Sequence, residues 1–243
     1  MSRQRIDEQA AFVLHTYPWR ETSLVVEVFS REHGRLPLVA KGARRPGSQL
    51  RGVLMAFQPL QVSWSGRGEV KTLTAASWRG GQPLLGGVAL LSGYYLNELL
   101  LRLVPREDAH VGLFDHYAAT LLQLAHGEPH APLLRAFELA LLRELGYAPT
   151  LDRLADSDEP VSPQGTYLYI AERGVIEATG NFGDAPTLSG RALLDMARGD
   201  FSAADTLVQA RALMRRLIQH YLGGQTLESR RILIELQDIG AGL

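Results

Sequence analysis

The chain has 243 residues, of which 46% are hydrophobic and 21% charged, and its formal net charge is -1. It contains no cysteine, which excludes disulfide bonds and thiolate metal sites. No signal-peptide core follows the N-terminus and no apolar run approaches ~18 residues, so we expect a soluble cytoplasmic protein.

The net charge conceals an uneven distribution along the chain. Residues 1–80 contain 12 Lys and Arg against 6 acids, a net charge of +6, whereas residues 81–243 contain 13 against 20, a net charge of -7. This division suggests a basic domain that meets a polyanion and a second domain with another task. Chance segregation of solvated charges is the alternative.

The first 80 residues have the short alternating pattern of strands. In the stretch 23–30, for example, Leu24, Val26 and Val28 fall on one face. We predict five strands at residues 11–17, 23–30, 34–41, 57–65 and 70–77. Pro37 lacks the amide that a ladder needs, so we expect a strand edge or a bulge there. Five short strands favour a closed barrel, and the OB-fold is the best-known five-stranded form.

After residue 80 the apolar period becomes helical. We predict helices at residues 84–104, 111–125, 131–146, 188–197, 203–222 and 227–236. The polar stretch 150–165 precedes a predicted hairpin that turns at Arg173-Gly174. The fold class is therefore α+β: an OB-fold domain at 1–80, then a mainly α-helical domain at 81–243 with a small β-hairpin insertion at about 150–180.

Positive charge is concentrated in one loop of the basic domain. The sequence "KGARRPGSQLRG" joins the third and fourth predicted strands and holds Lys41, Arg44, Arg45 and Arg51 without an acid. Arginine presents paired donors that suit phosphate, so we predict a nucleic-acid site rather than a solvated loop. The candidate DNA-binding residues are Arg20, Arg35, Lys41, Arg44, Arg45, Arg51, Arg67 and Lys71.

Four aromatic residues of the same domain could offer base-stacking surfaces: Tyr17, Trp19, Phe57 and Trp64. For Phe57 and Trp64 we favour a place in the barrel core. Trp19 lies beside Pro18 and Arg20 at a turn, so it is the better candidate for an exposed ring.

At these residues the sequence resembles a known family. The segment "AFVLHTYPWRETSLVVEVFSREHGRLPLVAKGARRPGSQLRGVLMAFQPL" is similar to the start of the RecO family of bacterial DNA-repair proteins. The likeness continues in "GRGEVKTL", "SGYYLNELLLRLVP", "RAFELALLRELGY" and "YLGGQTLESRRIL". It covers nearly the whole chain, and the motifs are specific in combination.

The resemblance implies an N-terminal OB-fold, a helical domain and a mediator of DNA repair and homologous recombination in the RecF pathway. Such proteins bind single- and double-stranded DNA and anneal complementary strands. With RecR they help RecA replace single-stranded-DNA-binding protein (SSB), and they dock on the acidic C-terminal tail of SSB. The expected place is the cytoplasm, with the nucleoid.

The sequence departs from the family in one module. Many members carry a four-cysteine zinc module after the third helix, whereas the corresponding stretch here, "GYAPTLDRLADSDEPVSPQGTYLYIAERG", has neither cysteine nor histidine. We therefore predict no zinc and no other cofactor, and a hairpin held by packing of Tyr167, Tyr169 and Ile176.

Nothing in the sequence indicates an enzyme. No P-loop motif and no G-x-S-x-G elbow occurs. His126 and His130 come nearest to a metal pair, but Gly127 and Pro129 break the helix that would align them. Two alternatives stay open besides a DNA mediator: an OB-fold RNA-binding or ribosome-associated protein, and a protein–protein adaptor.

The SSB tail implied by the resemblance needs an apolar pocket with a cation at its rim. The candidate residues for this site are Arg102, Arg135, Phe137, Leu141 and Arg143. We favour Arg135, which matches the family pattern in "PLLRAFELALL". The alternative is that Phe137 and the leucines are core, and that the arginines pair with Glu138 or Glu144.

Overall fold

The computed structural model describes residues 5–179, 187–229 and 231–232. The chain divides into two compact units, Met1–Glu128 with Leu227–Leu243 and Pro129–Thr226, which we call the first and the second unit. Residue 80, the expected domain boundary, lies inside the first unit. No helix in the described ranges is both long and apolar enough to cross a membrane.

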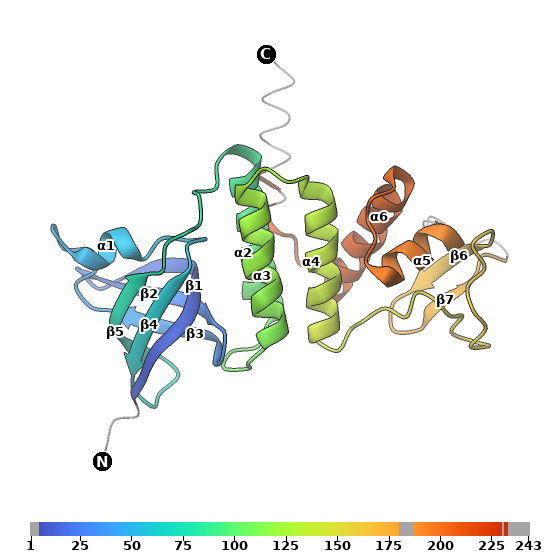
Figure 1. Cartoon of the computed structure of the whole chain (residues 1–243). Coiled ribbons are helices and arrows are strands. Elements are labelled where there is room, and N and C mark those ends of the chain that lie inside the picture. Colours follow the sequence, from blue (N-terminus) through green and yellow to red (C-terminus); the bar gives the residue numbers. More distant parts are fainter. Residues whose placement is uncertain (1–4, 180–186, 230, 233–243) are drawn as a thin grey trace. The chain divides into compact units, whose positions relative to one another are not determined.

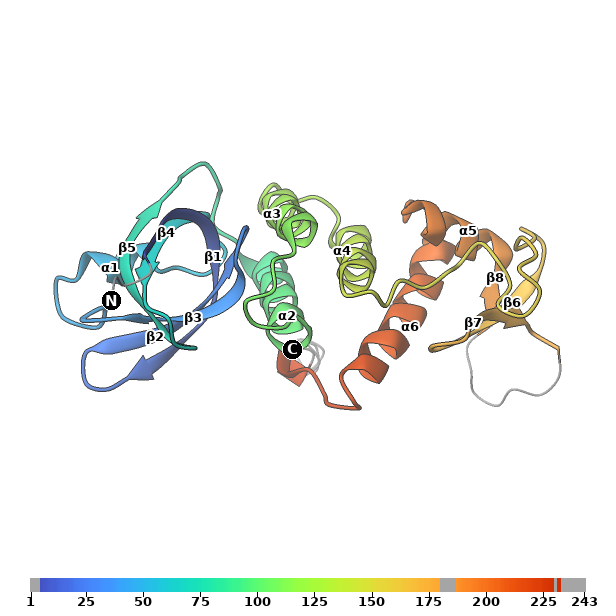
Figure 2. The same cartoon turned by 90° about the horizontal axis from the view of Figure 1, so that it is seen from below.

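Five strands of the first unit close into a barrel in the order β1-β2-β3-β5-β4, which Figure 2 shows nearly end-on. They are β1 (Arg5–Trp19), β2 (Ser23–Ser30), β3 (Gly34–Ala40), β4 (Leu60–Ser65) and β5 (Lys71–Trp78). The predicted five-stranded barrel is confirmed. Strand β1 begins earlier than predicted because its first half pairs with β4 and its second half with β2, with a register shift in each pairing.

The barrel closes through a short seam between β3 and β5. Only Leu38 with Lys71 and Val39 with Thr72 pair across it, in parallel. Pro37 lies just before the two β3 residues that pair with β5, so no hydrogen bond to β5 is lost through the missing proline amide. On the other side, the register between β3 and β2 continues through Pro37 without a bulge. The expected strand edge is therefore present, and the expected bulge is not.

The first unit also contains two longer helices, α2 (Gly87–Leu103) and α3 (Val111–Ala125), which Figure 2 shows next to each other and which Figure 1 shows with α3 in front of α2. Asn97 of α2 donates its side-chain amide to the carbonyl oxygen of Leu14 in β1, at 2.8 Å. The hydroxyl of Tyr117 in α3 donates to the side-chain oxygen of the same asparagine. These buried bonds fix both helices against the barrel, because each group would be costly to leave unpaired.

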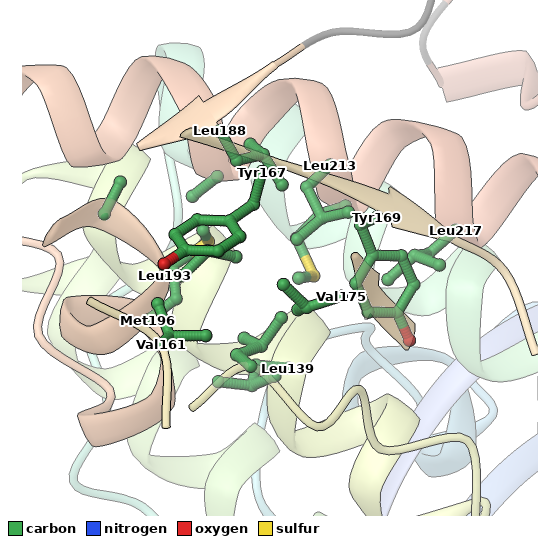
Figure 3. Packing of buried hydrophobic residues seen from close by; sticks show 14 of the residues in the cluster. Leu139, Val161, Tyr167, Tyr169, Val175, Leu188, Leu193, Met196, Leu213 and Leu217 are labelled. Carbon is green, nitrogen blue, oxygen red and sulfur yellow. The ribbon is translucent and has the colours of Figure 1, made fainter. Parts of the chain in front are cut away.

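The second unit combines helices with a three-stranded sheet of order β7-β6-β8. Its elements are α4 (His130–Glu144), β6 (Thr166–Ile170), β7 (Gly174–Glu177), β8 (Leu188–Ser189), α5 (Gly190–Arg198) and α6 (Ala204–Tyr221). Figure 3 shows the apolar cluster between them, in which Tyr167, Tyr169 and Val175 of the hairpin meet Leu213 and Leu217 of α6. The predicted hairpin is confirmed.

Several details differ from the predicted elements, and β4 and α2 each begin three residues later than expected, at Leu60 and Gly87. The basic loop contains a short helix, α1 (Gln49–Val53), where we expected loop alone. Residues 188–189 pair with β6 as β8, so the predicted helix starts only at Gly190, and Ser189 caps it by accepting from the amide of Ala192. In the last predicted helix, residues 228, 229, 231 and 232 are helical, and the others in 227–236 either precede the helix or lie outside the described residues.

Candidate nucleic-acid interface

The basic loop, residues 41–52, is held against the barrel by its backbone and by one small side chain. Ala43 is buried in the barrel core. The amide of Arg44 donates to the carbonyl oxygen of Thr22 in the β1–β2 turn at 2.9 Å, and the amide of Arg45 donates to that of Gly42 at 3.0 Å. Gly42 has a φ of 69°, a conformation that glycine adopts without strain. These contacts fix the loop while its longer side chains extend outward.

The four loop cations all face solvent. Lys41, Arg44, Arg45 and Arg51 are exposed, the last on α1. None of them forms an ion pair with an acid within the described ranges. Burying a charge is costly, whereas an exposed and unpaired cation can meet a phosphate without first losing a partner. The loop is therefore prepared for an anionic ligand.

The loop and the β1–β2 turn border one broad depression of about 900 Å³. Arg20 lies with its guanidinium 6.0 Å from the ring centre of Trp19, and its carbonyl oxygen accepts from Arg44 at 3.4 Å. The lining residues are Trp19, Arg20, Glu21, Thr22, Ser23, Val39, Lys41, Gly42, Arg45 and Thr72. The structure thus brings three predicted cations, Arg20, Lys41 and Arg45, to one site, with Arg44 beside it.

The depression offers two kinds of contact that suit a nucleic-acid strand. Lysine and arginine bind phosphate oxygens, and an aromatic ring can stack on a base. Trp19 is 47% exposed, which confirms the expectation of an exposed ring. Tyr17 is also 47% exposed, although its ring contacts that of His15. Phe57 and Trp64 are buried, as favoured from the sequence.

Two other predicted cations are engaged inside the first unit. Arg35 donates to the buried carboxylate of Glu27 at 3.3 Å and to the carbonyl oxygen of Val104 at 3.0 Å. Lys71 pairs with Glu107 at 2.5 Å. Both side chains are largely buried, so neither is as open to a phosphate as the loop cations. Their role in DNA binding stays a prediction.

Arg67 of the β4–β5 loop is exposed but lies away from the depression described above. It borders a separate pocket of about 210 Å³ together with Lys71 and the acids Glu32 and Glu107. The acids there offset the positive charge, so this pocket is less suited to an anion. The structure therefore places Arg67 and Lys71 together, apart from the basic loop.

Sequence reasoning did not single out several contributors to the depression. Thr22, Ser23 and Thr72 add small polar side chains, and Glu21 adds a negative charge. Thr72 reaches the site because β5 pairs with β3 across the seam, and that pairing joins residues more than thirty positions apart. The proximity of Glu21 to Arg20 was visible in the sequence, whereas the position of Thr72 was not.

The residues predicted for the SSB tail lie in both units, so we describe each by itself. In α4, Arg135 pairs with Glu138 at 2.5 Å. The side chain of Arg135 is 12% exposed and that of Glu138 is 1% exposed. Phe137 and Leu141 are buried. Arg143 is exposed and donates to the carbonyl oxygen of Ala197 at 3.2 Å. In α2, Arg102 lies 3.8 Å from Glu98. The tail site stays a prediction, and Arg143 and Arg102 are its more accessible cations.

The hairpin, for which no metal was predicted, is stabilised by contacts of its own residues. The hydroxyl of Tyr167 accepts from the amide of Ser162 at 2.9 Å, and Arg173 pairs with Asp156 at 2.9 Å. In the ranges that the structure describes, no group of three or more histidines and acids could hold a metal ion. The contacts described here and the apolar packing of Tyr167 and Tyr169 stabilise this region.

Chelator treatment should accordingly leave the thermal unfolding curve unchanged, because packing rather than metal ligation holds the hairpin. Differential scanning calorimetry with and without EDTA checks this, and elemental analysis of the purified protein gives the zinc content. Stoichiometric zinc, or a lower Tm after chelation, would contradict the expectation.

Comparison with known proteins gives matches over nearly the whole chain. Residues 1–81 match the family described as "Recombination protein O N terminal", and residues 86–231 match "Recombination protein O C terminal". The "DNA repair protein RecO" of Aromatoleum aromaticum is 65% identical over 237 residues, covering 98% of this chain and 99% of the relative. That of Azoarcus sp. is 60% identical over 240 residues, with 98% and 99% covered. That of Ralstonia nicotianae is 57% identical over 239 residues, with 98% and 88% covered.

Proposed function

Because the chain belongs to the RecO family of DNA repair proteins, we propose that it is a non-enzymatic mediator that binds DNA and anneals complementary strands. The observation that supports this most is the basic loop. Its four cations are exposed without acid partners in the described ranges, beside an exposed tryptophan. This combination suits a phosphate backbone whose bases stack without regard to sequence.

Annealing follows from this chemistry without a covalent step. Two DNA strands repel each other through their phosphates, and base pairing supplies the free energy once they meet. A surface that neutralises phosphates and releases their counterions lowers the repulsion. No residue then needs to act as an acid, a base or a nucleophile, which is why we propose that the protein is not an enzyme.

The partners in this proposal are single- and double-stranded DNA, the acidic C-terminal tail of SSB, RecR and, indirectly, RecA. Contact with SSB would hold the protein on coated strands, so complementary segments would meet at a raised effective concentration. With RecR, the protein would help RecA to load where SSB is displaced. Its place in the cell would be the cytoplasm, with the nucleoid.

A double variant of the basic loop tests the DNA site. Arg44→Ala with Arg45→Ala should lower the salt slope of single-strand binding by about 1.4, because each lost phosphate contact removes roughly 0.7. Binding should also weaken, by about 25-fold at 0.1 M salt if the whole counterion term of two contacts is lost. Titration of a labelled oligonucleotide by fluorescence anisotropy at several salt concentrations gives both quantities.

A matched control removes the same charge from the same unit. Arg5 and Arg31 are cations of the first unit that already pair with Asp7 and Asp115. Arg5→Ala with Arg31→Ala should therefore keep the wild-type slope. If the loop variant also keeps both its affinity and its slope, the loop is not the DNA site. Stronger binding to a matched RNA strand would favour the RNA-binding alternative.

A further inference from the structure

Two exposed aromatic side chains lie on the outer surface of strand β1. The residues that alternate with Tyr17 and Trp19 pair with Val26 and Leu24, which pack in the barrel core. Successive side chains of a strand point to opposite faces, so both rings point outward, on residues about 7 Å apart. Each of the two residues is 47% exposed, although His15 contacts the ring of Tyr17 with centres 4.4 Å apart.

Strand pairing places both rings beside the depression at the basic loop. Tyr17 pairs with Val25 of β2, and Val25 pairs with Val39 of β3. Across the seam, Val39 pairs with Thr72 of β5. Partners across a sheet lie on the same face, so these four residues form one row on the outside of the barrel. Val39 and Thr72 line the depression, as does Trp19. The result is one uncharged surface, which we call the ring face: Tyr17, Trp19, Val25, Val39 and Thr72.

Cations border the ring face. Arg20, Lys41 and Arg45 line the same depression, and none of them pairs with an acid in the described part of the chain. The acid among the lining residues, Glu21, lies in the turn after β1. A ligand here meets positive charge at the border and flat apolar surface beside it. A single nucleic-acid strand matches both, because its phosphates are anionic and its unpaired bases are planar, whereas an acidic peptide need not carry any ring.

We propose that Tyr17 and Trp19 stack on unpaired bases and thereby make this site select single strands over duplex DNA. The inference rests on the proposed function, and it adds the residues that distinguish the two forms of DNA. Cations bind the phosphates of either form, but the bases of a duplex face each other and cannot lie flat on the rings. An annealed duplex therefore loses the stacking contacts, and it dissociates faster than the strands from which it formed.

A strand without bases separates stacking from phosphate binding. Wild type should bind oligo-dT about thirtyfold more tightly than an abasic strand with the same number of phosphates, because stacking of two bases contributes at least that much. Tyr17→Val with Trp19→Val removes both rings and keeps the strand propensity. This variant should bind the two strands equally and keep the wild-type salt slope, because its phosphate contacts remain. Fluorescence anisotropy titrations at several salt concentrations give the affinities and the slopes.

Two further variants and a duplex complete the test. Tyr17→Phe with Trp19→Phe should restore most of the preference, because it restores the rings. Trp78→Val with Tyr94→Leu is the control: it removes the same two kinds of ring from the first unit, at 58% and 48% exposure, and should keep the full preference. Affinity for a duplex of the same length should be equal in wild type and the valine variant. Thermal unfolding checks folding, and if the double valine variant unfolds, Trp19→Val alone should leave a preference of about fivefold.

The outcomes separate this inference from the proposed function. If the valine variant keeps the thirtyfold preference, or loses affinity for both strands equally, Tyr17 and Trp19 do not stack on bases, and the inference is wrong while the proposed function stands. An equal loss of preference in the control variant would overturn the inference as well. Failure of wild type to bind either strand would contradict the proposed function itself.

Discussion

Glu27→Ala is expected to destabilise the first unit by about 3 kcal/mol, because it removes one partner from a buried ion pair. The side chain of Glu27 is only 4% exposed, and it accepts from both Arg35 and Arg106. Arg35 is itself 14% exposed and would keep its charge without the carboxylate. Arg106 is nearly half exposed, so water can solvate its guanidinium once the carboxylate is removed. We therefore expect a loss of stability near the low end of the range for broken buried ion pairs.

Urea unfolding followed by circular dichroism measures this cost as a shift of the midpoint at constant slope. Arg31 and Asp115 provide the control, because they form an ion pair within the same unit at 38% and 55% exposure. Arg31→Ala should cost less than about 1 kcal/mol, as exposed pairs usually do. Equal shifts for the two variants would show that the Glu27 cluster does not hold the barrel and the segment after α2 together.

Arg135→Glu should destabilise the second unit by about 3 kcal/mol or more. The variant places a second carboxylate one turn from Glu138, whose side chain is 1% exposed, and removes the guanidinium that pairs with it. A substitution that breaks a buried pair and adds a like charge cannot leave the helix packing unchanged. Thermal unfolding of the purified variant measures the loss.

Arg143→Glu is the matched variant, since it makes the same change at an exposed position of the same helix. It should lower the stability far less, and equal losses would contradict the structural role of Arg135. An SSB-tail titration should therefore use Arg143→Ala and Arg102→Ala, because weaker binding by Arg135→Glu would also follow from misfolding.

The barrel was predictable because its strands are local and alternate clearly. Glu27 shows where that reasoning ends. In strand β2, Glu27 faces away from Leu24, Val26 and Val28, so the alternation suggests that it faces solvent. It is buried because a segment more than seventy residues later covers it: Arg106 donates to its carboxylate, and Val104 accepts from its partner Arg35. A strand pattern says which side chains share a face but not what later segment covers that face.

The basic loop shows the same division. Its charge could be read directly, and the four cations are exposed as a phosphate site requires. The short helix α1 could not be predicted, because it has only five residues, one of them the glycine Gly52, and so few residues carry too little periodic signal. Arg35 and Arg45 look alike in the sequence. Only tertiary pairing separates the one bound to Glu27 from the one that borders the depression.

The measurement that tests the account most directly is the rate at which two complementary strands anneal in the presence of the protein. Wild type and the control variant Arg5→Ala, Arg31→Ala should accelerate annealing at low salt, and the acceleration should decline as salt rises. Arg44→Ala with Arg45→Ala should lose most of it while unfolding at the wild-type temperature. A loop variant that anneals strands as fast as wild type would contradict the claim that the exposed cations of the basic loop carry the function.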